Sequence, residues 1–157
     1  MSFIKFMVLL AMLPASFTAI AQAPEPGLES EYLMDIVLET AAPQQAGTRL
    51  IVPITGGSFE GPGIKGKILD VGADWISTRP DGVNDLDVRI TLETDDHALI
   101  YMTYAGILDR TGAGAYWRMV PTFETGAEKY QYLTKIIAVG VGKRMDGKTA
   151  YRIYRIL

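Results

Sequence analysis

Several polar residues stand inside segments that read as β-strands, where an unpaired polar group is costly to bury. Asp74 begins one such segment and is followed directly by Trp75. A carboxylate beside an indole can act as a desolvated acid or base with an aromatic wall. The alternative is an aspartate that caps a turn next to a core tryptophan, and the sequence leaves both interpretations open.

Asp87 and Arg89 lie two positions apart, so they share one face of a strand. If that face lines a lumen, the two side chains form an ion pair that orients an anionic or carbonyl substrate. If the face meets water, they form a weak surface pair.

Further candidates come from neighbouring strand segments. Arg118 and Glu124 are six positions apart and share a face, unless Pro121 adds a bulge between them. Tyr101 can donate its phenol to an oxyanion or pack at a barrel mouth, and Arg49 lies on an early strand. The candidate catalytic residues are therefore Asp74, Arg89 and Glu124, and the candidate ligand-binding residues are Arg49, Trp75, Asp87, Tyr101 and Arg118.

Two features that suggest a cofactor or metal are better explained by turns. Residues 61–66 spell G-x-G-x-x-G, but they run into a strand pattern rather than a helix, and no βαβ unit surrounds them. His97 is the only histidine, and it sits beside Asp95 and Asp96 at a predicted hairpin tip. The chain also has no cysteine. We therefore expect no cofactor, no metal and no triad hydrolase.

The elements that must position these residues are short strands. In residues 85–93, apolar and polar residues alternate, which is the period of a strand with two different faces. Many such segments joined by glycine turns predict an antiparallel barrel or sandwich. The expected strands are residues 32–40, 49–55, 65–71, 74–78, 85–94, 98–104, 116–124, 135–141 and 149–156, with a glycine loop at 56–63 and one short helical turn within 125–133.

The alternation leaves open which face lies inside. Leu86, Val88, Ile90 and Leu92 can line the lumen, as is normal for an all-β protein of this size. Alternatively, they face a subunit interface and the charged face lines a polar lumen.

The first 21 residues read as a secretory signal peptide. Lys5 precedes an apolar run, and Ala19-Ile20-Ala21 is a small-x-small cleavage signal before Gln22. Residues 22–27 then form a proline-containing leader, and residues 28–157 form one domain. The chain has 15 Lys and Arg against 18 Asp and Glu, so removing Lys5 with the peptide gives a net charge of −4. This predicts a periplasmic or secreted protein that binds neither nucleic acid nor membrane after cleavage.

An ordered series of sequence blocks covers nearly all of residues 28–157. The blocks are Gly47…Arg49…Pro53-Ile54, Gly56-Gly57…Phe59…Gly61-Pro62…Gly66, Gly72-Ala73-Asp74-Trp75, Leu86-Asp87…Arg89, Thr94-Asp95-Asp96…Ile100-Tyr101, Tyr116…Arg118…Pro121, Phe123-Glu124-Thr125-Gly126 and Val139-Gly140…Gly142…Arg144. In their order and spacing, these blocks resemble one family, DUF3237, also called UPF0311.

The resemblance implies a single antiparallel β-barrel of the allene-oxide-cyclase-like group, with about eight to ten strands. That group includes isomerases, cyclases and dirigent-type proteins. We therefore expect a small carbonyl or acidic organic ligand in the lumen and a cofactor-independent isomerase, cyclase or lyase. The alternatives are a non-catalytic periplasmic ligand-binding barrel and a structural homo-oligomeric barrel.

Overall fold

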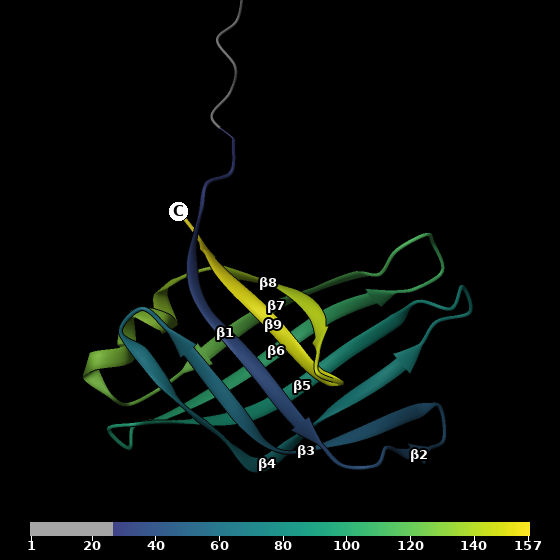
Figure 1. The fold of residues 1–157 in the computed structure, drawn as a ribbon, viewed down its shortest axis with the longest axis horizontal. Helices are drawn as coiled ribbons and strands as arrows, with labels where there is room; N and C mark the ends of the chain where they lie inside the picture. The colour runs from purple at the N-terminus through teal and green to yellow at the C-terminus, as the bar shows by residue number, and fades with distance from the viewer. Residues whose placement is uncertain (1–26) are drawn as a thin grey trace, which may run out of the picture.

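The alternating segments of the chain pair with one another to form one nine-stranded antiparallel sheet (Figure 1). The computed structural model describes residues 27–157, so the predicted signal peptide lies outside the described residues. The elements are β1 (Ser30–Thr40), β2 (Gln44–Ala46), β3 (Arg49–Gly61), β4 (Ile64–Thr78), β5 (Asn84–Thr94), β6 (Leu99–Asp109), β7 (Tyr116–Glu124), the 3-10 helix η1 (Glu128–Lys135), β8 (Ala138–Met145) and β9 (Lys148–Ile156).

The sheet closes because β1 pairs with both β9 and β3. Eight strands form the closed barrel, and β2 pairs only with the start of β3. Closure leaves those eight strands without a free edge, which is how antiparallel barrels avoid edge-to-edge aggregation. The predicted all-β barrel is confirmed.

The apolar face of each strand lies inside the barrel. Leu86, Val88, Ile90 and Leu92 of β5 are each no more than 3% exposed. The side chains of Asp87 and Arg89 on the opposite face are about half exposed, at 47% and 48%. Of the two arrangements that the alternation allows, the structure has the apolar lumen.

Strands β3 and β4 are longer than the sequence pattern predicts. Residues 56–61 belong to β3, and β4 runs unbroken across the two segments predicted as separate strands. The predicted loop at 56–63 and the predicted break near residue 72 are therefore wrong. The pattern was misread because the pairing shifts register inside both strands, between Pro53 and Gly57 and between Ile68 and Gly72.

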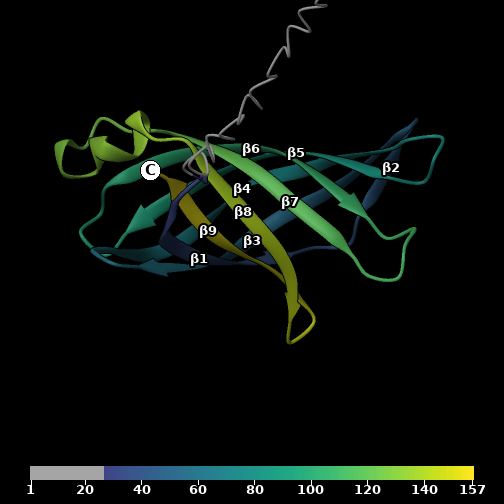
Figure 2. The same ribbon diagram turned by 90° about the horizontal axis from the view of Figure 1, so that it is seen from above.

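One end of the barrel is covered by η1, which carries the predicted helical turn (Figure 2). Its Tyr130 and Leu133 are 3% and 1% exposed and pack against the core. The β4–β5 and β6–β7 loops lie at the opposite end, hereafter called the mouth. Within residues 27–157, no helix has the length and apolar character needed to cross a membrane.

Candidate functional site

A cavity of about 110 Å³ lies inside the barrel near the mouth. Most of its wall is apolar, from side chains such as Leu38, Ile54 and Leu108 on three different strands. The polar, charged and aromatic residues of its wall are Thr40, Asp74, Arg110, Trp117, Arg144 and Thr149. An apolar cavity with a few convergent polar groups is typical of a small-molecule site.

Asp74 reaches this cavity because of its place in the strand alternation. It pairs with Val88 of β5, and directly opposed residues in a sheet point to the same side. Val88 is fully buried in the core, so Asp74 also faces the lumen. Its Oδ1 atom is buried and has no hydrogen-bond partner among the described residues. A buried carboxylate oxygen without a partner carries a desolvation cost, and such costs are frequent at functional sites.

Burial raises the pKa of Asp74 to about 7. A backbone hydrogen bond from Asp87 opposes the rise, and the negative charge of Asp87 adds to it. At neutral pH the protonated and ionised forms of Asp74 are therefore both well populated. A group poised in this way can both take up and give back a proton.

Three aromatic residues pack close to one another in the same part of the lumen. The ring centroid of Tyr151 lies 5.4 Å from that of Tyr104 and 5.3 Å from that of Trp117, both in edge-on contact. The hydroxyls of both tyrosines and Nε1 of Trp117 are buried. Burial raises the pKa of both phenols, the negative charge of Asp74 contributes, and hydrogen bonding among the three side chains also acts on the two pKa values. The two phenols therefore stay protonated.

Glycine on β8 makes room for the indole. A Cβ at Gly142 would lie 2.4 Å from the ring of Trp117, and a Cβ at Gly140 would lie 2.6 Å from the methyl carbon of Met119. Only a residue without a side chain lets these large side chains lie against β8.

Two arginines stand at the rim of the cavity. The guanidinium of Arg144 lies 5.9 Å from the ring centroid of Trp117. Its Nη1 donates to Oγ1 of Thr149 at 3.2 Å and to the carbonyl oxygen of Gly147 at 3.3 Å. Arg110 follows β6 at the start of the β6–β7 loop. None of the ion pairs within residues 27–157 involves Arg110 or Arg144.

Of the eight site residues predicted from the sequence, the structure brings only Asp74 into the cavity. Asp87 and Arg89 pair with each other on the outer surface, with 3.1 Å between Oδ1 and Nη1. The guanidinium of Arg89 stacks 5.3 Å from the ring centroid of Trp75, which is also on the outer face. Arg89 therefore does not line the cavity that holds Asp74, because the polar face of β5 is the solvent face.

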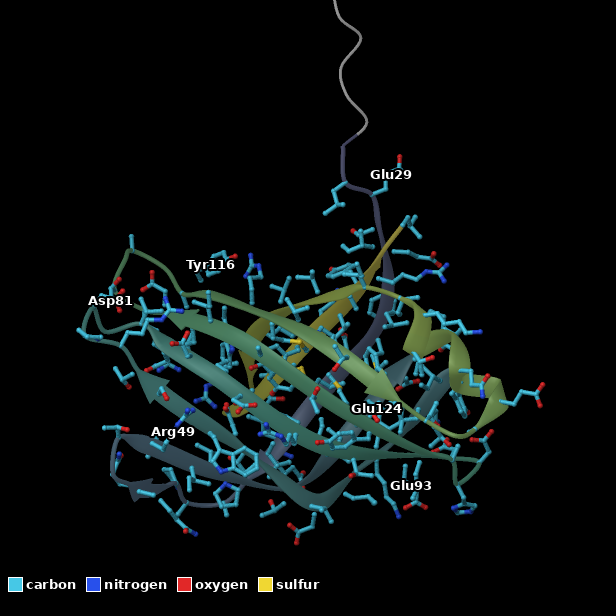
Figure 3. The ribbon with its side chains drawn as sticks, turned by 180° about the vertical axis from the view of Figure 1, so that it is seen from behind. Glu29, Arg49, Asp81, Glu93, Tyr116 and Glu124 are labelled. Atoms are coloured by element: carbon cyan, nitrogen blue, oxygen red, sulfur yellow. The ribbon has the colours of Figure 1, made fainter. Side chains whose placement is uncertain are left out.

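The other predicted residues are also outside. Arg49 is exposed and donates to the carbonyl oxygen of Trp75 at 3.3 Å. Arg118 stacks on the ring of Tyr116, with 4.9 Å to its centroid, and Tyr101 is 38% exposed. Glu124 lies on the surface toward the covered end, whereas Arg49 and Tyr116 lie toward the mouth (Figure 3). Glu124 does not line the cavity that contains Asp74.

Sequence reasoning missed Tyr104, Trp117, Tyr151 and Arg144. The three aromatic residues lie on the apolar face of their strands rather than on the polar face, whereas Arg144 is exposed at the end of β8. Tyr104 lies on the same face of β6 as Ile100 and Met102, and Tyr151 lies on the same face of β9 as Ile153. Because the apolar face of each strand points into the lumen, the better site candidates were the residues that place a polar atom on that face.

A larger open cleft, of about 410 Å³, lies at the covered end. It contains Asp96, which accepts from Nζ of Lys129 at 2.6 Å and from the hydroxyl of Tyr130 at 2.8 Å. Lys129, Thr94 and Tyr130, in that order, lower the pKa of Asp96. This carboxylate is fully paired and ionised, so it clamps η1 to the β5–β6 turn and is poorly suited to proton transfer.

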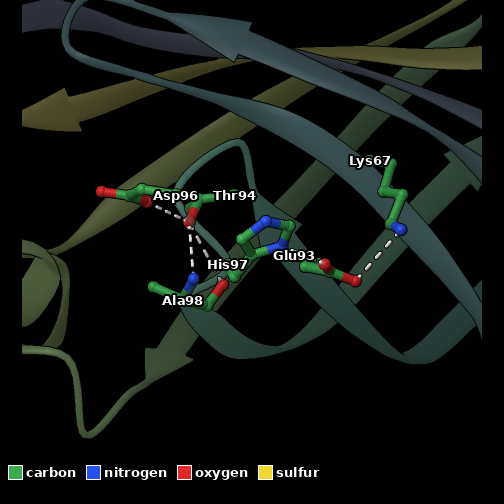
Figure 4. A network of polar contacts seen from close by, with 6 residues as sticks. All are labelled: Lys67, Glu93, Thr94, Asp96, His97 and Ala98. Atoms are coloured by element: carbon green, nitrogen blue, oxygen red, sulfur yellow. Dashed lines mark hydrogen bonds and ion pairs between the residues drawn. The ribbon is translucent and has the colours of Figure 1, made fainter.

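The same turn holds the single histidine (Figure 4). His97 has a φ of 65°, and its Nδ1 lies 3.0 Å from Oε1 of Glu93, which also pairs with Lys67 at 3.2 Å. Oγ1 of Thr94 accepts from the backbone of Ala98 at 2.9 Å. Within the described part of the chain, no group of three or more His, Asp and Glu side chains is arranged to hold a metal ion.

The DUF3237 family model, described as a protein of unknown function, matches residues 26–156. The chain belongs to the DUF3237 family. A DUF3237-like relative, the UPF0311 protein of Rhodopseudomonas palustris strain TIE-1, is 32% identical over 151 residues, which cover 84% of this chain and 99% of the relative. The resemblance noted in the sequence is therefore confirmed.

Two further proteins are similar over most of this DUF3237 chain. The crystal structure of a β-barrel-like protein from Acinetobacter baumannii has a TM-score of 0.77 and 34% identity, covering 87% of this chain and all of the other. The hydroalkoxylation enzyme phnH of Penicillium herquei is 27% identical over 149 residues, which cover 90% of this chain and 92% of the enzyme. A distant homologue of this family member is thus an enzyme.

Proposed function

We propose that this barrel is a cofactor-independent proton-transfer enzyme that isomerises or cyclises a small carbonyl or unsaturated organic molecule in its mouth cavity. The observation that carries the proposal is the Asp74 carboxyl, which faces the cavity with a pKa raised to about 7. Trp117 lines the same cavity, and the ring of Tyr151 packs against the indole and against Tyr104.

In the proposed reaction, the Asp74 carboxylate takes a proton from the substrate, and the resulting carboxylic acid returns it at a different atom. Negative charge that develops on a substrate oxygen is stabilised by hydrogen bonds from a buried phenol or the indole. A low-dielectric wall strengthens these hydrogen bonds. The net change is the relocation of one proton, so no electrons leave or enter the substrate.

The name of the Penicillium relative supports this class of chemistry. Hydroalkoxylation adds the O–H of an alcohol across a carbon–carbon double bond, so the proton lost by oxygen is gained by carbon. That reaction also needs a proton donor and acceptor and no change of redox state. The cavity volume of about 110 Å³ is close to that of a cavity that holds a benzene ring, about 150 Å³. It would admit the reacting ring or carbonyl portion of a substrate.

The proposal is tested by proton exchange with solvent. The protein is incubated in D₂O with a panel of small ketones, keto acids and alkenyl phenols, and deuterium uptake is followed by NMR. We expect uptake above the buffer rate for at least one compound, and a loss of about 10²- to 10⁴-fold in Asp74→Asn, the usual contribution of a general acid or base.

Asp87→Asn is the matched control, because Asp87 is the neighbouring carboxylate on the outer face. It should leave the exchange rate unchanged. Equal exchange by wild type and Asp74→Asn, or no exchange above buffer across the panel, would contradict the proposal.

A further inference from the structure

The two rim arginines are the charged groups of the cavity that the proposed reaction does not use. Arg110 and Arg144 line the same cavity as Asp74, and neither has a carboxylate partner within residues 27–157. Of the other arginines, Arg79, Arg89, Arg152 and Arg155 are paired with carboxylates. Arg49 and Arg118 donate to backbone carbonyl oxygens and do not line the cavity. The mouth therefore presents guanidinium groups without carboxylate partners beside a cavity whose wall also contains Asp74 and Trp117.

Arg144 is held in place for such a role. Oγ1 of Thr149 and the carbonyl oxygen of Gly147 accept from its Nη1, and the ring of Trp117 lies under the guanidinium. Its positive charge also lowers the pKa of Tyr151, against the larger effect of burial, which places it near the phenol. A guanidinium that is already fixed loses little freedom on binding a ligand.

Arg110 is positioned by the turn that begins the β6–β7 loop. Oδ1 of Asp109 accepts from the backbone nitrogen of Thr111 at 2.8 Å and from its hydroxyl at 2.7 Å. Arg110 stands between these two residues. The turn therefore fixes the backbone on both sides of this arginine.

We infer that Arg110 and Arg144 form an anion-recognition site at the mouth, so that the substrate is an organic acid. Its carboxylate or phenolate lies at the rim against the guanidiniums, and its planar apolar body enters the lumen along Trp117. Guanidinium groups bind planar oxyanions through paired, charge-assisted hydrogen bonds. This inference rests on the proposed function, because it names the substrate class of the same cavity.

The test uses benzoate as the anionic probe and benzamide as its neutral counterpart of the same shape. Binding of each to the full-length protein is measured by NMR chemical-shift titration. We expect benzoate to bind at least about tenfold more tightly than benzamide, the discrimination typical of a charge-assisted hydrogen bond. Arg144→Gln should remove most of that preference, Arg110→Gln part of it, and the double variant all of it.

Lys143→Gln is the control, because Lys143 is the exposed neighbour of Arg144 on β8 and carries the same charge toward solvent. It should leave the preference for benzoate unchanged. Equal binding of the two probes, no binding of benzoate at 10 mM (roughly 3 kcal/mol of affinity), or an equal loss in Lys143→Gln would overturn the inference.

Binding is read without turnover, so the two proposals fail separately. Benzoate preference that depends on Arg144, together with deuterium exchange that does not depend on Asp74, supports the anion site and contradicts the proposed reaction. The opposite pair of results contradicts the anion site alone.

Discussion

At the scale of single residues, the carboxyl group of Asp74 is the charged group of the lumen whose buried Oδ1 atom has no hydrogen-bond partner among residues 27–157. Each buried polar atom without a partner costs about 1–3 kcal/mol relative to a satisfied one. The core otherwise consists of apolar side chains, with Thr94 as its one buried polar residue in the part of the chain that the structure describes. A fold that accepts these costs at one place gains chemistry there, because a desolvated acid and desolvated donors are what proton transfer needs.

The raised pKa of Asp74 predicts a pH-dependent stability of definite sign. The folded-state pKa is about 7 against an ordinary aspartate pKa of 3.8, so the folded protein binds the proton more tightly and loses stability as pH rises from about 4 to 7. Asp74→Asn removes the ionisable group. It should therefore be more stable than wild type at pH 8, by at most about 4 kcal/mol, and closest to wild type at pH 4.

Thermal melts of both proteins between pH 4 and pH 9 measure this difference. Asp87→Asn, on the solvent face, should give a curve parallel to that of wild type. A difference between Asp74→Asn and wild type that stays constant from pH 4 to pH 9 would show that the carboxyl is not desolvated in the folded state.

At the scale of strands, the inward face of each strand supplies the side chains of both the hydrophobic core and the cavity wall. Period-two alternation predicted most of the strands and the barrel, because a closed sheet must bury one face of every strand. The same alternation misled the choice of site residues. Arg89, Asp87 and Glu124 were chosen for their charge, and charge is what places a side chain on the solvent face.

The strand pattern could not show two further things. The register shifts in β3 and β4 lie where these strands pair with each other and with β1 and β5, so they depend on partner segments that the pattern within one strand does not contain. The convergence of Tyr104, Trp117 and Tyr151 depends on which strands meet across the lumen, and no local pattern encodes that. Asp74 was selected because it is a carboxylate beside an indole inside a predicted strand, and it also belongs to a family block.

The glycine on β8 gives a prediction at this scale. Gly142→Ala places a Cβ 2.4 Å from the ring of Trp117, so the indole must shift out of the cavity wall. Overpacking of this kind costs about 1–3 kcal/mol, and the shift should also weaken benzoate binding. Chemical denaturation and the benzoate titration measure the two effects.

Gly112→Ala is the matched control, because no atom lies within 4 Å of a Cβ at that loop position. It should leave both stability and benzoate binding close to wild type. If Gly142→Ala behaves like Gly112→Ala, the close packing of Trp117 against β8 does not position the indole.

At the scale of the whole molecule, the two ends of the barrel have different roles. The η1 end is closed by Tyr130 and Leu133 and clamped by the Asp96 contacts. The mouth end carries the cavity, the rim arginines and the loops. Under the proposed function, a substrate would enter and leave at the mouth, and changes to the η1 clamp should affect stability rather than binding.

We also propose that the protein is exported and acts as a soluble periplasmic or secreted protein. The basis is the apolar run and the Ala19-Ile20-Ala21 cleavage signal, both of which lie outside the described residues. Intact-mass measurement on periplasmic material should give the mass of residues 22–157. A membrane-bound species that retains residues 1–21 would contradict this.

The central claim is that Asp74 titrates near neutral pH inside the mouth cavity, and its carboxyl group can be observed directly. Infrared difference spectra of wild type minus Asp74→Asn isolate the C=O stretch of the protonated acid, which is followed between pH 3 and pH 9. We expect one carboxyl with an apparent pKa of about 7 that moves when benzoate is added. A carboxyl that is fully ionised by pH 5, near the ordinary aspartate value of about 3.9, would contradict the account.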